Sequence, residues 1–384
     1  MIIIMLGAPG TGKGTVAGMI EKGIGIKQVS TGDIFRKNMQ EGTELGKLAE
    51  SYISKGQLVP DDVTIKTAKD RLEEKDVENG IILDGFPRTI EQAKALDKIL
   101  EEKNYRIYEY VLFSSKKSAG KIINFKGKDY TVRELTINSF VQEHFDFAIF
   151  SAGGYTSKLN SPIAAEHGCI VIDNSSAFRM DPSVPLVVPE VNPEDITKNN
   201  GIIANPNCST IQAVLPLKVL DDNYKIKRIV YSTYQAVSGA GIYGIKDLEN
   251  GIKGLPNEKF PHQIYNNCLP HIDDFLDNGY TKEEEKMINE TRKILHKPDM
   301  PITATTVRVP VFNCHSESIN IELENDFTLD DVRKELKSFN GIKVIDDIKN
   351  NLYPLACNCS GFDEVFVGRI RRDNSVKYGL NLWV

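Results

Sequence analysis

Residues 7–15 read Gly7-Ala8-Pro9-Gly10-Thr11-Gly12-Lys13-Gly14-Thr15 and directly follow the apolar run Met1–Leu6. A strand, then Gly-x-x-x-x-Gly-Lys, then a helix is typical of a phosphate-binding loop. The glycines let backbone N–H groups point at phosphate oxygens, and Lys13 reaches the outer phosphates beside the positive end of the helix. The usual Ser or Thr after the lysine is Gly14 here, and Thr15 follows it. The stretch predicts an α/β fold that begins with a phosphate site at Gly10, Thr11, Gly12, Lys13, Gly14 and Thr15.

The composition is that of an ordinary globular protein: 384 residues, 41% hydrophobic, 26% charged, with a net charge of -6. This length suits two or three domains. The acidic balance leaves no basic stripe for nucleic acid or anionic lipid, and Met1–Leu6 is too short for a signal peptide or membrane span. Six cysteines make no disulfide framework, and no His cluster completes a zinc site with Cys357 and Cys359. We expect a cytoplasmic protein with no metal, nucleic-acid or membrane partner.

Short apolar runs alternate with amphipathic helical patterns over the first two hundred residues, which is typical of a mostly parallel sheet. From about Lys227 onward, longer strands with alternating side chains indicate an α+β domain. No polar, Pro/Gly-rich linker lies near Asn104, so we expect the chain to continue within one fold there. The expected strands are 1–6, 80–83, 108–113, 147–150, 169–172, 202–204, 229–234, 303–309, 318–323 and 364–370, and the expected helices are 43–55, 61–74 and 89–103.

Three further motifs accompany the phosphate loop: Ser30–Arg36 (STGDIFR), Gly56–Asp61 (GQLVPD) and Leu83–Thr89 (LDGFPRT). With the loop, they resemble adenylate kinase over about residues 1–103. The resemblance implies an ATP phosphate site at the loop and a second site for AMP, for whose phosphate the forked arginine donors are suited. The implied AMP-binding residues are Thr31, Arg36, Gln57, Leu58, Val59, Gly85, Phe86, Pro87, Arg88 and Gln92.

Adenylate kinases continue with a mobile lid and further arginines that close over the transferring phosphoryl group. No such segment follows Lys103. Because phosphoryl transfer depends on this closure and on neutralising charge, we expect the segment to bind nucleotide and to transfer phosphate poorly.

From about residue 104 the motifs change. They are Ser114–Lys121, Ser151–Gly154, Asn174–Met180, Asn205–Thr210, Ser232–Gly241, Glu290–Lys293 and Arg308–Ser316. In this order they resemble aspartate-semialdehyde dehydrogenase, which implies a Rossmann-like NADP-binding domain followed by a catalytic domain that forms a homodimer.

Two residues carry the chemistry. Cys208 follows Asn207 in a polar loop after a buried strand, where a helix N-terminus can lower the pKa of the thiol. A thiolate there would attack an aldehyde or acyl phosphate carbon, and His315, titrating near neutrality, would move the proton. The resemblance makes Gln235 the third catalytic residue. It also implies that the substrate is held by Asn207, Gln235, Arg308 (α-carboxylate), Glu290 (amine), and Arg179 and Lys293 (phosphate).

Cys314 departs from the resembled pattern. The family usually has a small residue before the catalytic histidine, and a thiol fits there only if the backbone does not need a positive φ.

The cofactor loop departs further. The family opens with a strand, a glycine-rich dinucleotide loop and a helix, and kinase-like residues 81–103 stand in their place. We expect the sheet to close but NADP affinity to fall, because Phe86 and Pro87 stand where the backbone must approach a pyrophosphate closely. The family's last helix is also absent after Val384, which exposes apolar surface and removes another contact. The predicted cofactor contacts that remain are Lys117, Ser118, Ser238 and Gly239.

These observations predict a fusion. The fold class is α/β: a P-loop kinase fragment (1–103), a Rossmann-like parallel sheet (104–206) and an α+β catalytic and dimerisation domain (207–384). The implied reaction is the NADP-dependent, reversible reductive dephosphorylation of L-aspartyl 4-phosphate, on the route to lysine, methionine and threonine. Two alternatives stay open: an adenylate kinase that converts ATP and AMP into two ADP, or an inactive product of recombination or sequence assembly. Residues 98–103 suit the helix of either family and mark a possible crossover point.

Overall fold

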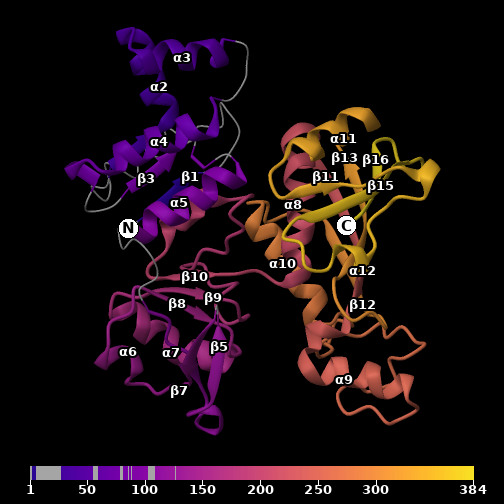
Figure 1. The fold of residues 1–384 in the computed structure, drawn as a ribbon. Coiled ribbons are helices and arrows are strands. Elements are labelled where there is room, and N and C mark those ends of the chain that lie inside the picture. Colours follow the sequence, from indigo (N-terminus) through magenta and orange to yellow (C-terminus); the bar gives the residue numbers. More distant parts are fainter. Residues whose placement is uncertain are drawn as a thin grey trace. The chain divides into compact units, whose positions relative to one another are not determined.

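The computed structural model describes residues 2–5, 27–54, 59–77, 81–84, 86–87, 89–102, 109–125 and 127–384. The chain divides into two compact units, Met1–Glu134 and Leu135–Val384, drawn from indigo to yellow along the sequence in Figure 1. The join expected near residue 103 falls inside the first unit. The division into three domains at residues 103 and 206 stays a prediction.

The first unit is built on a three-stranded parallel sheet in the order β1-β3-β2. The central strand is buried, because Ile81, Ile82 and Leu83 have no exposed surface. Helices pack around it, with side chains of α4 and α5 completing the core. The elements are β1 (Ile2–Met5), β2 (Lys27–Ser30), α2 (Thr31–Glu41), α3 (Glu44–Ile53), α4 (Asp61–Leu72), β3 (Ile81–Asp84), α5 (Ile90–Glu102), β4 (Phe113–Ser114), β5 (Ile122–Phe125), β6 (Lys128–Thr131) and β7 (Arg133–Glu134).

Strand β3 corrects the expectation that a kinase-like strand would complete the dehydrogenase sheet. It pairs on both sides with kinase-like strands, β1 and β2, and so is the middle of a sheet of its own. The strand expected at 108–113 is also wrong over its described part: only Phe113–Ser114 is a strand, paired with the two-residue β7. A strand extends only as far as a partner can bond it, and β7 is short.

The second unit begins with a three-stranded parallel sheet in the order β10-β9-β8, so the α/β prediction is confirmed. Helix α7 packs against all three strands. The elements are α6 (Ser139–Gln142), β8 (Phe147–Phe150), α7 (Gly154–Glu166), β9 (Ile170–Asp173), β10 (Ile202–Ala204) and α8 (Cys208–Tyr224).

A six-stranded sheet in the order β12-β11-β13-β16-β15-β14 forms the rest of the second unit. Side chains alternate between a buried and a more exposed face, and α8, α10 and α11 pack on the buried face. The elements are β11 (Ile226–Gln235), α9 (Gly241–Ile252), α10 (Lys282–Ile294), β12 (Ile302–Arg308), β13 (Ser316–Leu323), α11 (Leu329–Ser338), β14 (Ile342–Val344), α12 (Ala356–Cys359), β15 (Val365–Asp373) and β16 (Gly379–Trp383). The expected strands of this region are all present, with ends that differ by up to three residues.

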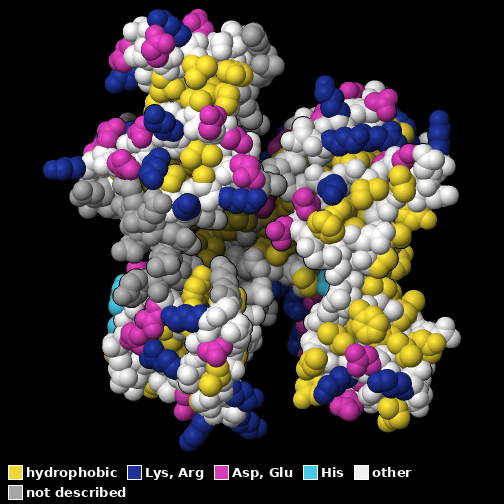
Figure 2. Space-filling model, viewed as in Figure 1, with side chains coloured by type: hydrophobic (Ala, Val, Ile, Leu, Met, Phe, Trp, Pro, Cys, Tyr) yellow, Lys and Arg dark blue, Asp and Glu magenta, His cyan; other side chains and the backbone are white. Residues whose placement is uncertain are grey.

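Exposed apolar side chains gather over α9 and the loop after it, the yellow area low on the second unit in Figure 2. Ile242, Tyr243, Ile252 and Leu255 are each more than half exposed. Apolar patches of this kind are typical of surfaces that bind another protein. Every helix in the described ranges is too short or too polar to cross a bilayer.

Candidate functional site

The loop between β10 and α8 presents Cys208. The thiol belongs to the first residue of a 17-residue helix, and its side chain is exposed. Asn207 caps the helix, because its Oδ1 accepts hydrogen bonds from the N–H groups of Ser209 (2.9 Å) and Thr210 (3.4 Å). Asn207 is itself held by two buried carboxylates: its N–H donates to Glu290 (2.6 Å) and its Nδ2 to Glu283 (2.9 Å). The residue before Cys208 is therefore held firmly by hydrogen bonds.

The surroundings raise the pKa of the Cys208 thiol, which corrects the predicted lowering. Cys208 as a residue is exposed, but protein atoms surround much of the thiol, and this loss of hydration is the largest cause. The negative charge of Glu283 raises the pKa further, and ionisation of Glu317 would add to this effect. The Ser209 N–H at the helix N-terminus and the Arg308 charge lower it, but they are outweighed.

Ala236 brings two of the predicted residues together just beyond the end of β11. Its N–H donates to Nδ1 of His315 (3.0 Å), and its carbonyl accepts from Nη1 of Arg308 (2.6 Å). Gln235, the residue before it, lies opposite Arg308 in the register of β11 and β12. Arg308 and Glu283 act electrostatically on both Cys208 and His315. The thiol and the imidazole thus belong to one site.

His315 is neutral at physiological pH, so the predicted titration near neutrality is wrong. Burial, and secondly the nearby Arg308 charge, lower the pKa of His315 to about 4. Because Nδ1 accepts the Ala236 N–H, the neutral ring carries its proton on Nε2. His315 is therefore a hydrogen-bond donor at Nε2.

Arg308 is a buried cation with N–H donors that are not all hydrogen-bonded. Its side chain is 5% exposed, Nη1 is bonded to Ala236, and Nε has no hydrogen-bond partner. Burial lowers the pKa of its guanidinium, and the neighbouring Glu283 opposes this. A buried donor without a partner is costly, and a carboxylate can accept two parallel bonds from a guanidinium. The side chain is thus arranged to receive a small anion.

Glu283 is the site residue that sequence reasoning missed. Its Oε1 accepts from Asn207 Nδ2 (2.9 Å) and Gln235 Nε2 (3.4 Å), and its Oε2 pairs with Lys286 (3.2 Å). It lies in the first turn of α10, where Thr281 and Glu284 form a capping box. The signal was available as the run Thr281-Lys-Glu-Glu-Glu, but it indicates a helix start and does not show which carboxylate faces the site.

Arg179, Glu290 and Lys293 lie together, but most of their hydrogen-bonding groups already bond to the protein. Arg179 donates to Glu290 (3.1 Å) and to the carbonyls of Asn174 (3.0 Å) and Asn205 (2.9 Å). Lys293 donates to the carbonyls of Arg179, Asp181 and Val184 at 2.7 to 2.8 Å. An ammonium has three protons. A phosphate could therefore bind Lys293 only if one of these bonds broke, whereas Arg179 keeps two unused N–H groups.

The predicted cofactor residues are split between the units. Lys117 and Ser118 lie in a short helical turn of the first unit, and Ser238 and Gly239 in a turn after β11. A Cβ on Gly239 would lie 3.0 Å from Arg308 Nη1 and 3.2 Å from His315 Nε2. The backbone of this turn therefore lies directly against the site, where a larger residue would force the two side chains apart.

The nucleotide residues predicted in the first unit are partly described. Thr31 is buried at the start of α2, Arg36 pairs with Asp33 and Val59 is buried. Gln92 donates to Asp61 (2.7 Å), a contact the sequence did not indicate. Phe86, which precedes Pro87, has no exposed surface and packs in the core. Gly10, Thr11, Gly12, Lys13, Gly14, Thr15, Gln57, Leu58, Gly85 and Arg88 lie outside the described residues.

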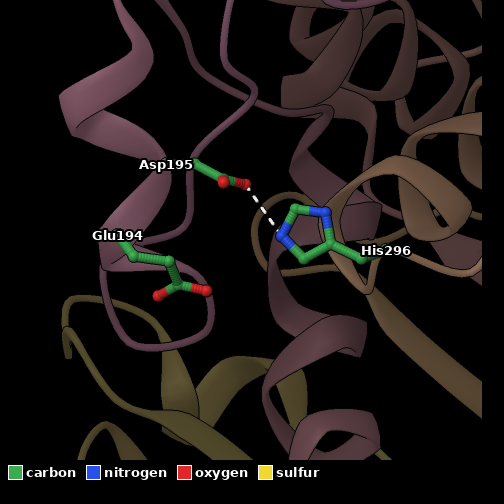
Figure 3. A group of neighbouring side chains, drawn as sticks. All are labelled: Glu194, Asp195 and His296. Atoms are coloured by element: carbon green, nitrogen blue, oxygen red, sulfur yellow. Dashed lines mark ion pairs between the residues drawn. The ribbon is translucent and has the colours of Figure 1, made fainter.

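Glu194, Asp195 and His296 form a group whose oxygen and nitrogen atoms could surround a cation (Figure 3). Both Asp195 oxygens are already in use: Oδ1 pairs with Lys198, and Oδ2 accepts from Asn192 (2.7 Å) and pairs with His296 (3.0 Å). We assign the group a structural role, in which Asp195 connects its own turn to His296, two residues beyond the end of α10.

Cys314 has a φ of +65°, the conformation in which a glycine was expected. A residue with a Cβ is disfavoured there by about 1–2 kcal/mol, partly offset by the extra flexibility of glycine in the unfolded chain. We expect Cys314→Gly to raise the free energy of unfolding of the second unit by about 0.5 to 1 kcal/mol. Urea unfolding followed by the fluorescence of Trp383, the single tryptophan, would measure it. Cys314→Ala, which keeps the Cβ, is the control, and a glycine variant no more stable than it would contradict the prediction.

Comparison with known proteins follows this division of motifs. Residues 5–121 match the family model for adenylate kinase. Residues 92–199 match the semialdehyde dehydrogenase NAD binding domain, and residues 217–384 match the semialdehyde dehydrogenase dimerisation domain. The kinase match and the NAD-binding match overlap from 92 to 121, a stretch that includes the proposed crossover at 98–103. The predicted fusion of the two families is confirmed.

Similar proteins match the larger part of the chain. Aspartate-semialdehyde dehydrogenase of Aquifex aeolicus (strain VF5) is 54% identical over 306 residues, 77% of this chain and 89% of the relative. The Bacillus subtilis (strain 168) protein of the same name is 46% identical over 301 residues, 75% of this chain and 86% of the relative. The crystal structure of aspartate semialdehyde dehydrogenase II from Vibrio cholerae is 43% identical, with a TM-score of 0.69 over 76% of this chain and 88% of that one.

Proposed function

Because the chain belongs to the aspartate-semialdehyde dehydrogenase family, we propose that it catalyses the NADP-dependent, reversible reductive dephosphorylation of L-aspartyl 4-phosphate through a thioester on Cys208. One observation carries the proposal. An exposed thiol at a helix N-terminus is grouped with a neutral imidazole and with a buried guanidinium whose Nε has no hydrogen-bond partner. A nucleophile, an oxygen-binding donor and an anion site are what acyl transfer through sulfur requires.

In the oxidative direction, the Cys208 thiolate bonds to the aldehyde carbon, and the carbonyl electron pair moves to the oxygen. His315 donates its Nε2–H to that oxygen and so stabilises the negative charge. The nicotinamide, when bound, supplies the acceptor for the hydride that leaves the same carbon. Cys208 then holds the acyl group as a thioester, and attack by a phosphate oxygen breaks the C–S bond and returns the thiolate.

Two buried side chains of opposite charge suit the amino-acid end of the substrate. Arg308 has the unbonded Nε for the α-carboxylate. Glu283, 6% exposed and beside Gln235, has the negative charge for the α-ammonium group. Glu290, which the resemblance implied for the amine, is instead paired with Arg179. We therefore propose that Glu283 binds the amine.

The described residues fit part of a nicotinamide nucleotide. The turn of Ser238 and Gly239 lies against His315, next to the reacting carbon. Helix α7 starts at Gly154, and Gly153 before it provides no side-chain cap. A Cβ on either glycine would meet open space, so the first N–H groups of the helix are accessible. These groups would hold part of the cofactor. Phe86, by contrast, is core and supplies no pyrophosphate contact.

Lys286 suits phosphate better than Lys293, because it keeps an ammonium proton unbonded whereas Lys293 uses all three. It pairs with Asp273 (2.6 Å) and Glu283 (3.2 Å), is 26% exposed and keeps one ammonium proton free. We expect Lys286→Ala to raise the KM for phosphate roughly 10- to 100-fold, the effect of losing one charged hydrogen bond. Lys293→Ala should instead lower the free energy of unfolding by about 2 kcal/mol, because it frees three backbone carbonyls. Phosphate kinetics and urea unfolding of both variants test this, and a larger KM effect at Lys293 would reverse the assignment.

We also propose that the first unit binds adenine nucleotides, since residues 5–121 match adenylate kinase and Thr31, Val59 and Gln92 belong to an ordered parallel-sheet unit. Calorimetric titration with AMP and with ATP should detect binding, and Lys13→Ala should weaken ATP binding alone. Coupled formation of ADP from ATP and AMP would establish kinase activity as well.

The dehydrogenase proposal is tested by incubating the purified chain with L-aspartate semialdehyde, phosphate and NADP+. NADPH should form only when phosphate is present, and the same assay with NAD+ compares the two cofactors. No NADPH above a reaction without protein would overturn the proposal. We expect a homodimer, since residues 217–384 match a dimerisation domain and α9 has exposed apolar side chains. Light scattering measures that state.

A further inference from the structure

Glu317 is a buried acid that the proposed steps do not use. It is the second residue of β13, has no exposed surface, and neither carboxyl oxygen accepts a well-formed hydrogen bond. Side chains two residues apart on a strand point to the same face, and every second residue of β13 from Glu317 onward is buried. Glu317 therefore lies on the buried face of the sheet, where α8 packs against β13, two residues after His315 in the chain.

Polar side chains from both α8 and β13 lie near the thiol. Gln212 follows Cys208 by four residues on α8, so it lies one turn below the thiol on the same side of the helix. Its amide interacts with Glu317, although its Nε2 is buried and makes no full hydrogen bond. On the sheet, Glu317 is opposite Thr233, which in turn is opposite Thr306. Gln212 and Glu317 thus lie between α8 and β13, one helical turn from Cys208.

A negative charge on Glu317 would be unfavourable. Burial, the largest cause, raises the pKa of Glu317 well above its usual value, and the nearby Glu283 raises it further. The titratable groups that interact with it are Cys208 on α8, Glu283 on α10 and Tyr231 on β11. Arg308 on β12 and His315, which precedes β13, interact in turn with Glu283. An ionised Glu317 would add a second carboxylate charge to that of Glu283 and oppose a thiolate at Cys208.

We propose that Glu317 is a positioning residue of the reaction, which presupposes the proposed function: it is a neutral carboxylic acid near Cys208 at neutral pH, and its ionisation at alkaline pH opposes formation of the thiolate. The acid acts through the thiol and does not touch the substrate. Loss of its proton at alkaline pH competes with loss of the thiol proton, so the two groups titrate as a coupled pair.

The test is the alkylation of Cys208 by iodoacetamide, followed across neutral to alkaline pH by mass spectrometry of the peptide that contains it. This readout is specific to one of six thiols and needs no turnover. Glu317→Gln keeps the shape and cannot ionise, so the midpoint of the alkylation rate should move down by about one pH unit, a tenfold change in thiolate fraction. Glu317→Met should move it in the same direction, which separates charge from hydrogen bonding if the glutamine variant does not fold.

Thr306→Val is the matched control, because Thr306 lies in the same row and its Oγ1 is also buried without a partner. Its midpoint should equal that of the unmodified protein. Equal midpoints in Glu317→Gln, Glu317→Met and the unmodified chain would overturn the inference. A shifted midpoint without any dehydrogenase rate would overturn the proposed function and leave the control of the thiol by Glu317 standing. Dehydrogenase activity with an unshifted midpoint would support the proposed function and overturn the role of Glu317.

Discussion

Replacing Cys208 with serine will reduce phosphate-dependent NADPH formation by roughly 10⁴-fold or more, because the covalent route has no other nucleophile at that position. Serine preserves the helix start at Asn207 and nearly preserves the side-chain volume, so the fold should not change. Its hydroxyl, however, cannot ionise in a place where even the pKa of the thiol is raised. Initial rates at saturating substrate would measure the loss.

Cys268→Ser is the matched control, since Cys268 is also an exposed free thiol of the second unit and makes no predicted contact with substrate. Its rate should stay within about twofold of the unmodified chain, as surface substitutions usually have little effect. Mass spectrometry of the unmodified chain with substrate and cofactor but without phosphate should detect an acyl group on the Cys208 peptide. A serine variant that retains a substantial rate would exclude the thioester route.

The second large effect is expected at Arg308. Arg308→Ala should lower kcat/KM for the semialdehyde roughly 10²- to 10⁴-fold, the equivalent of two charge-assisted hydrogen bonds to the α-carboxylate. The change should appear mainly in KM, because the carboxylate is remote from the reacting carbon. Arg308→Lys keeps the charge but loses the fork and should recover only part of the activity.

A substrate analogue makes this prediction specific. With an amino aldehyde that lacks the α-carboxylate, Arg308→Ala and the unmodified chain should have similar kcat/KM values, because the contact is already missing. Arg372→Ala, at an exposed guanidinium paired with Asp326, is the control for a general loss of positive charge. An equal loss at Arg308 with both substrates would show that Arg308 supports the fold and does not recognise the carboxylate.

Cys208, Gln235, Arg308 and His315 were all predicted before the fold was known, because each lies in a short motif with neighbours of distinctive type. The same holds for the strands at 147–150 and 202–204, whose apolar runs are local features. The strand at 108–113 was not predictable, since its length depends on β7, a partner some twenty residues away. Glu283 and Lys286 were missed because the first turn of α10 contains three consecutive glutamates, and the sequence does not show which of them faces the site.

The sequence alone determined that two families are joined in this chain, which cysteine lies in the motif predicted to hold the nucleophile, and which side chains have the chemistry to bind an amino-acid substrate. These are properties of residue type and spacing along a few positions, so they can be read without coordinates. The tertiary structure decided the protonation states: the raised pKa of Cys208, the neutral His315 with its proton on Nε2, and the buried Glu317 near Cys208. Hydration and charge at an atom depend on everything packed around it, and α8, α10, β11, β12 and β13 meet only when the chain has folded.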